Sequence, residues 1–240
     1  MTGPRIAGTG PETNMLTISA TGDWRTAHPG ATIGLLELSG IDNTGSPPRL
    51  SERKRELEAR LRERYGGFTR RDFVSLPVLS VYDRYYRRFD KTYHLQLQIE
   101  SIVLKGKNLP DVSPAVDSNF MAELETLVLT AGHDGMKLRG SISMDVSREG
   151  DRMTQMNGVS KAIRAGDMIM RDAEGICCSI LYGQDNRSPL SPESSRVLYV
   201  AYAPAGVAAE LVEGQLEKIE GNIRLFSPNA TVEQRRLLAA

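Results

Sequence analysis

The sequence predicts an α+β fold in which helices pack against mainly antiparallel β-sheets. Long amphipathic stretches in residues 50–130 are typical of helices. From residue 140 to residue 203, short apolar runs alternate with Gly, Asp, Asn and Pro, which is typical of strands and turns. The order of strands, helices, strands and a final helix lacks the regular alternation of a doubly wound parallel sheet, so an antiparallel arrangement is favoured.

The first half of the chain is expected to hold most helices. Ser51 is a candidate N-cap for a charged amphipathic helix that ends at Gly66 and Gly67. Thr69 is a candidate cap for a short turn that stops before Pro77. The elements expected here are strands at 14–20 and 32–38, a turn-rich segment at 23–30, a loop at 40–48, and helices at 52–64, 78–89, 94–104 and 119–129.

The second half is expected to hold strands at 141–146, 168–172, 176–181 and 197–203, followed by a helix at 207–225. We predict a disordered lead-in at 1–12, one domain at 13–226 and a mobile C-terminal tail at 227–240.

Composition limits the function classes. The chain has 240 residues, of which 40% are hydrophobic and 25% charged, and this allows a sizeable core. Its formal net charge is zero, so RNA contacts would have to come from local patches. No apolar run is long enough to span a membrane, and residues 1–13 lack the apolar stretch of a signal peptide. These features favour a cytoplasmic protein that makes no membrane contact.

Arginine and tyrosine alternate along residues 82–88, with Arg84, Arg87 and Arg88 on one side of the expected helix. One interpretation is a helix with tyrosines inside and arginines in solvent. The other is an RNA-binding face, because arginine contacts phosphate and tyrosine stacks on bases.

The familiar catalytic motifs are absent from the sequence. It has no phosphate-binding loop, no HExxH and no GxSxG. Cys177 and Cys178 are adjacent, lack the spacing of a zinc site, and are interpreted as strand residues on opposite faces. We therefore predict no metal and no cofactor.

Polar residues flank the expected helix at 119–129. His133 and Asp134 lie in a predicted loop after it, where functional sites are common. Asp117 and Asn119 lie at its start and are interpreted either as N-capping groups or as groups that face a ligand.

The second half also carries an ordered series of short motifs. In chain order these are Val116-Asp117-Ser118-Asn119-Phe120, the segments 133–140, 147–151 and 156–158, Gly166-Asp167-Met168-Ile169-Met170-Arg171-Asp172, Glu174-Gly175, and an apolar strand that ends in Tyr182-Gly183-Gln184-Asp185-Asn186. The series resembles the central B-three/B-four module of the phenylalanyl-tRNA synthetase beta chain, in a free-standing form.

The resemblance implies a domain that receives the 3′ end of aminoacyl-tRNA and hydrolyses mischarged aminoacyl esters in trans. It implies catalytic roles for His133 and Asp117, and substrate contacts from Asn119, Asp134, Gly183, Gln184 and Asp185. We expect His133 to orient water with a pKa near neutrality. A partner synthetase is a possible tether. Nothing resembles a synthetase core, so ATP-dependent aminoacylation is not predicted.

Two departures from the family pattern leave an alternative open. The family histidine falls on Ala131, and a family carboxylate falls near Arg187. The alternative is a non-catalytic module that binds RNA or an amino acid in the inherited pocket.

Overall fold

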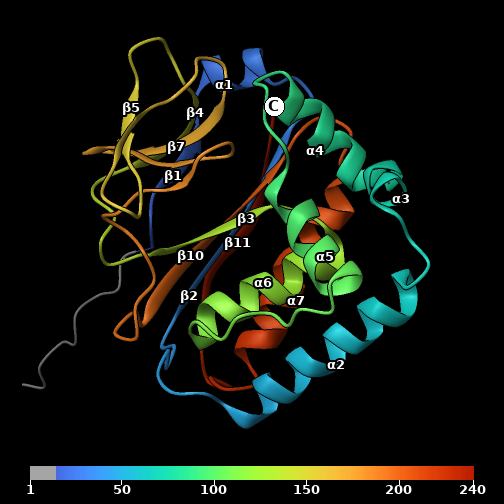
Figure 1. Cartoon of the computed structure of the whole chain (residues 1–240). Coiled ribbons are helices and arrows are strands. Elements are labelled where there is room, and N and C mark those ends of the chain that lie inside the picture. Colours follow the sequence, from blue (N-terminus) through green and yellow to red (C-terminus); the bar gives the residue numbers. More distant parts are fainter. Residues whose placement is uncertain (1–14) are drawn as a thin grey trace, which may run out of the picture.

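A computed structural model describes residues 15–240 of the chain as three layers (Figure 1). A long central sheet lies between a layer of helices on one face and a smaller sheet on the other. The central sheet has the order β11-β2-β10-β3, and all neighbouring strands are antiparallel. Its strands are β2 (Thr32–Ser39), β3 (Thr130–Asp134), β10 (Arg196–Ala203) and β11 (Thr231–Ala239).

The smaller sheet has the order β1-β4-β7-β8-β9, in which only β1 and β4 run parallel. A separate hairpin, β5–β6, extends beside it. The α+β prediction with mainly antiparallel sheets is therefore confirmed. These strands are β1 (Ile18–Ala20), β4 (Ile142–Val146), β5 (Arg152–Thr154), β6 (Ser160–Ala162), β7 (Met168–Asp172), β8 (Gly175–Ser179) and β9 (Gly183–Gln184).

All of the described helices except α1 lie on the side of the central sheet away from the smaller sheet, and α1 lies next to β4 of the smaller sheet (Figure 1). Helix α7 approaches β2 closely, since a Cβ on Gly34 would lie 2.6 Å from Cγ1 of Val212. None of the helices in the described part of the chain is long and apolar enough to cross a membrane. The helices are α1 (Gly22–Ala27), α2 (Pro48–Tyr65), α3 (Arg70–Ser75), α4 (Pro77–Arg87), α5 (His94–Leu104), α6 (Pro114–Thr126) and α7 (Ala209–Ile223).

Three predictions of local structure were wrong. The turn-rich segment at 23–30 contains helix α1, which Thr21 caps by accepting a hydrogen bond from the backbone N–H of Trp24 at 3.0 Å. Helix α2 begins at Pro48, which occupies a first-turn position where proline loses no helical hydrogen bond, so Ser51 is not its cap. Helix α6 begins at Pro114, so Asp117 and Asn119 lie within it rather than at its cap.

The C-terminal segment also differs from expectation. Residues 227–240, predicted as a mobile tail, contain the edge strand β11, which pairs with β2 along its length. Pairing with a buried central strand orders this segment, and local composition carries no signal for such long-range pairing. The predicted lead-in at 1–12 lies outside the described residues.

A buried ion pair joins the strands of the central sheet. Glu37 on β2 is fully buried, and its Oε1 accepts a hydrogen bond from Nε of Arg196 on β10 at 2.7 Å. The other carboxylate oxygen accepts from Nε2 of Gln234 on β11 at 2.6 Å and from the backbone N–H of Leu16 at 3.2 Å. One carboxylate therefore links β2, β10, β11 and the segment that leads into β1.

We predict that Glu37→Gln lowers the free energy of unfolding by about 3 kcal/mol, because it removes the buried negative charge that pairs with the Arg196 guanidinium. Urea denaturation followed by circular dichroism measures the loss. Glu220→Gln is the control, since Glu220 pairs with Arg224 and Arg235, whose side chains are 41% and 43% exposed. That change should cost less than about 1 kcal/mol. Equal losses in the two variants would contradict the importance of the buried pair.

Candidate functional site

A largely apolar cavity of about 330 Å³ lies at the β3 edge of the central sheet, where residues of the helical layer and of the smaller sheet meet. Its volume is at the lower end of the range for small-molecule sites. Helices α5 and α6 form one wall, β3 forms the floor, and β8 and β9 form the opposite wall. The lining residues are His94, Val112, Val116, Asn119, Phe120, Leu129, Thr130, Ala131, Gly132, Met156, Cys178, Ser179, Ile180, Gly183, Gln184, Leu190 and Tyr202.

Two buried polar atoms among the lining residues lack hydrogen-bond partners. Asn119 donates from Nδ2 to the carbonyl of Thr130 at 3.0 Å, which fixes its amide, while its Oδ1 has no partner among residues 15–240. The Tyr202 hydroxyl also lacks a conventional partner in the described structure and has only the Cys178 thiol, a weak hydrogen-bonding group, nearby. Unpaired buried polar atoms are costly, so a ligand that pairs with them would be stabilised.

The described wall of the cavity carries no Asp, Glu, Lys or Arg. Burial lowers the pKa of His94, which favours its neutral form. Burial also raises the pKa of the Cys178 thiol, which keeps it protonated and unreactive. The cavity is therefore uncharged, and its specificity must come from shape and from neutral hydrogen-bonding groups.

The structure brings three of the predicted substrate-binding residues to this cavity. Asn119 lies on α6, whereas Gly183 and Gln184 form β9 on the opposite wall. Asp117, His133, Asp134 and Asp185 are buried but do not line it.

Asp117 forms a structural ion pair on the far side of α6. Its Oδ2 lies 2.5 Å from Nζ of Lys54 on α2, which is itself buried, and its Oδ1 accepts from the backbone N–H of Val112 at 3.1 Å. Lys54 also bonds Asp111 at 2.7 Å. This geometry holds α6 against α2, and it gives Asp117 no access to a ligand in the cavity.

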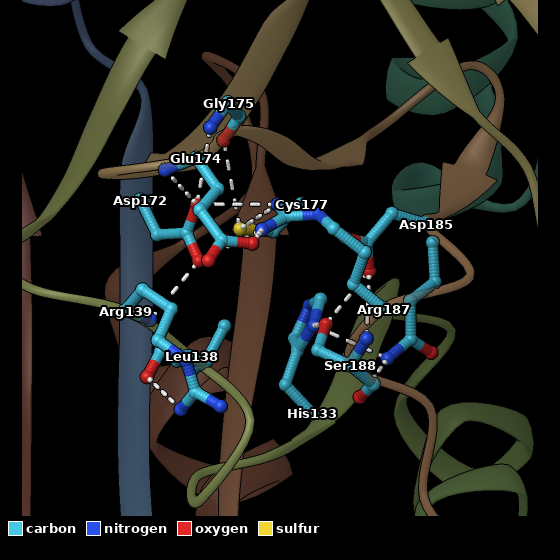
Figure 2. Close-up of polar contacts among 11 residues, drawn as sticks. His133, Leu138, Arg139, Asp172, Glu174, Gly175, Cys177, Asp185, Arg187 and Ser188 are labelled. Atoms are coloured by element: carbon cyan, nitrogen blue, oxygen red, sulfur yellow. Dashed lines mark hydrogen bonds and ion pairs between the residues drawn. The ribbon is translucent and has the colours of Figure 1, made fainter.

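His133 lies in β3 rather than in a loop, and its side chain is completely buried. Its Nδ1 is 2.8 Å from Oγ of Ser188 and 3.1 Å from Nε2 of Gln184 (Figure 2). Burial lowers the pKa of His133 to about 3, so the expected pKa near neutrality was wrong. The ring is neutral at physiological pH and reaches the cavity only through Gln184.

Ion pairs between one arginine and three carboxylates hold the turn that follows β9. Arg187 pairs with Asp172 at 3.1 Å, with Glu174 at 3.0 Å and with Asp185 at 2.9 Å (Figure 2). Asp185 in turn accepts from Oγ of Ser188 at 2.7 Å, next to His133. Arg187 is thus engaged by carboxylates of this chain, from β7, from the β7–β8 turn and from its own turn.

The remaining predicted residues lie apart from the cavity. Asp134 accepts from Oγ of Ser194 at 2.7 Å and pairs with Lys137 at 3.3 Å, so it holds a turn. The three predicted RNA-binding arginines are exposed: Arg84 and Arg87 lie on α4, where Arg87 pairs with Asp83 at 2.9 Å, and Arg88 follows the helix as its C-cap. Arg84 and Arg88 border a different hollow of about 200 Å³ that does not include any residue of the main cavity.

Sequence reasoning missed Tyr202, His94 and Cys178 as cavity residues. Tyr202 lies in a strand that is apolar throughout, so its hydroxyl looks like part of the core. Cys178 was interpreted as a buried strand residue, and the structure confirms that it is a free, buried cysteine. The signal for His94 was only its place at the start of a helix, a position it does occupy in α5.

The fold is α+β, and its candidate site is an uncharged cavity lined by helices and by strands of both larger sheets. The chain matches no protein-family model and no curated protein sequence. Among solved structures, it is similar to an N-terminal fragment of the phenylalanyl-tRNA synthetase beta-subunit from Pyrococcus horikoshii, with a TM-score of 0.49 and 7% sequence identity. The similarity is a weak one of fold, covering 98% of this chain and 57% of that one.

We predict that Tyr202→Phe leaves the free energy of unfolding unchanged or raises it by up to about 1 kcal/mol. The substitution removes a buried hydroxyl that lacks a conventional partner and keeps the ring that fills the core. Urea denaturation provides the measurement. Tyr199→Phe is the matched control, because the Tyr199 hydroxyl donates to the carbonyl of Ala115 at 2.8 Å and its loss should destabilise the protein. A Tyr202→Phe loss as large as the control loss would show that the hydroxyl is paired.

A buried carboxyl beneath the cavity predicts a pH dependence of stability. Glu123 on α6 accepts from the backbone N–H of Thr130 at 2.7 Å, and burial raises its pKa to about 8. The folded state therefore binds a proton that the unfolded state releases near its ordinary pKa of 4.5. This stabilising contribution is complete below pH 4.5 and is lost as the pH rises through 8.

We expect Glu123→Gln to make stability less dependent on pH between 5 and 8. The difference from the unmodified protein should approach about 1.4 kcal/mol per pH unit where the two states differ by one proton. Urea denaturation at several pH values tests this. Glu217→Gln, on the exposed face of α7, should retain the original pH profile. An unchanged profile in Glu123→Gln would show that Glu123 ionises normally in the folded protein.

Proposed function

We propose that the chain is a binding module whose cavity holds the aminoacyl group at the 3′ end of a tRNA. The observation that carries this proposal is the uncharged cavity of about 330 Å³ with an unpaired amide oxygen on Asn119 and a Tyr202 hydroxyl that lacks a conventional partner. A cavity of this size accommodates a single amino-acid side chain and the atoms next to it. The motif resemblance in residues 116–186 independently supports the same ligand class.

The absence of cations from the described cavity wall favours an aminoacyl ester over a free amino acid. A free amino acid carries a carboxylate, and burying that charge without a partner is strongly unfavourable. In an aminoacyl ester the carboxyl group is neutral, so the α-amino group is the one ionisable group of the backbone, and its N–H groups require hydrogen-bond acceptors. Oδ1 of Asn119 is such an acceptor, and the Tyr202 hydroxyl can be another.

Hydrolysis of the bound ester is the second candidate function, and Asn119 favours it. An aminoacyl ester is already activated, so a water held in position can be sufficient without a covalent nucleophile. The unpaired Oδ1 of Asn119 could accept a hydrogen bond from such a water. Gln184, which contacts His133, would fix the opposite wall rather than exchange protons.

Hydrolysis is tested by incubating the purified protein with a panel of mischarged tRNAs. Catalysis predicts an increase over spontaneous hydrolysis that falls at least tenfold in Asn119→Ala. Tight binding with no increase for any mischarged tRNA would leave the binding function and exclude the deacylase. The zero net charge means that affinity for RNA must come from local patches or from a partner synthetase in the cytoplasm.

We predict that Ala131→Leu weakens binding of the aminoacyl group at least tenfold. Ala131 lines the cavity from β3, so a larger side chain occupies the space that the ligand needs. Isothermal titration with amino acids linked as amides to the 3′ position of adenosine provides a stable probe. Ala59→Leu, on an exposed position of α2, is the matched control and should bind as the unmodified protein does. Equal affinity in Ala131→Leu would place the ligand outside this cavity.

A further inference from the structure

Two lysine side chains lie over the ring of Tyr182, which directly precedes the cavity residue Gly183, and an arginine lies near one of them. Nζ of Lys91 lies 4.3 Å from the centre of the Tyr182 ring, and Nζ of Lys161 lies 5.9 Å from it. Arg164 belongs to the same group, since its charge, like that of Lys161, lowers the pKa of Lys91 after the larger effect of burial. The three side chains come from the loop before α5, from β6 and from the loop before β7.

These charges are poorly compensated within the described part of the chain. Neither Lys91 nor Lys161 has an ion pair or a side-chain hydrogen bond among residues 15–240. Arg164 pairs at 3.2 Å with Asp90, whose side chain is 88% exposed, and such a pair contributes little. Asp167 also acts on Lys91, but more weakly than the two cations beside it. Like charges repel, so a group in which cations outnumber anions is stabilised when an anionic partner occupies it.

The backbone places this cationic group at the edge of the cavity. Lys91 precedes the cavity residue His94 by three positions, and Tyr182 directly precedes the cavity residue Gly183. Lys161 lies in the hairpin whose turn carries Met156, a cavity residue that is 60% exposed. Gln155 fixes this hairpin by donating from Nε2 to the carbonyl of Tyr182 at 3.0 Å.

We propose that Lys91, Lys161 and Arg164 form a phosphate-binding site at the cavity edge that takes a phosphodiester of an RNA 3′ end. This inference rests on the proposed function, because the aminoacyl group inside the cavity is attached to the terminal nucleotide of that RNA. Lysines suit phosphate as point charges, and they place no requirement on base identity. The uncharged cavity then selects the acyl group, and the cationic edge holds the backbone that carries it.

The test uses a short RNA hairpin with a single-stranded CCA end that carries an amide-linked amino acid. Its affinity is measured by fluorescence anisotropy at several salt concentrations. We expect the double substitution Lys91→Glu and Lys161→Glu to weaken binding at least tenfold. It should also make the slope of log affinity against log salt concentration shallower by about one or more, because fewer counterions are released on binding. The control protein carries Arg49→Glu and Lys105→Glu, which change net charge equally at exposed positions elsewhere. It should bind as the unmodified protein does.

The outcomes separate this inference from the proposed function. Equal RNA affinity in the double variant, or an equal loss in the control, overturns the phosphate site. The adenosine amide lacks a phosphodiester, so its binding should survive in the double variant if the cavity is intact, and a thermal melt checks folding. Failure of the amide to bind even the unmodified protein would instead overturn the cavity assignment. Tight binding of adenosine monophosphate that competes fully with the hairpin would show a mononucleotide site and exclude an RNA end.

Discussion

Strand β10 is buried on both faces along all eight of its residues, and the other layers are arranged around it. It pairs with β2 on one side and β3 on the other, so the central sheet is organised about it. A strand buried on both faces must be apolar almost throughout, as the sequence from Val197 to Ala203 is. The helices then cover one face and the smaller sheet covers the other, and the space between layers becomes the place for a site.

The cavity follows from how α6 is held above this sheet. The Tyr199 hydroxyl on β10 donates to the carbonyl of Ala115, while the buried pair of Lys54 and Asp117 holds the other side of α6 against α2. The helix therefore directs Asp117 away from the cavity and Asn119 into it. Side chains two positions apart on a helix point in different directions. Only one of the two polar groups can therefore face a ligand in the cavity.

The sequence was sufficient for the fold class and for elements with strong local patterns. Helix α5 and strands β2, β7 and β10 lie within one residue of their expected bounds, because apolar spacing determines them locally. It was insufficient for β3 and β11, since both are strands only through pairing with buried neighbours. Of the candidate site residues, Asn119, Gly183 and Gln184 reach the cavity. The partner of the buried Asp117 is Lys54, which comes from another helix, so local sequence could not reveal that Asp117 is engaged in an ion pair.

The distribution of charge within the fold divides the site into an uncharged cavity and a cationic edge. Glu37 and Asp117 each pair with a cation from another element, and Arg187 pairs with Asp172 on β7 as well as with Asp185 in its own turn, so these ionised groups are held in pairs. The cavity contains no ionised wall residue in the described structure, and Lys91 and Lys161 lie beside it without counter-ions there. Because salt screens exposed charges and has little effect on neutral hydrogen bonds inside a cavity, the two regions respond differently to salt. A ligand with a neutral acyl end and an anionic backbone matches that division.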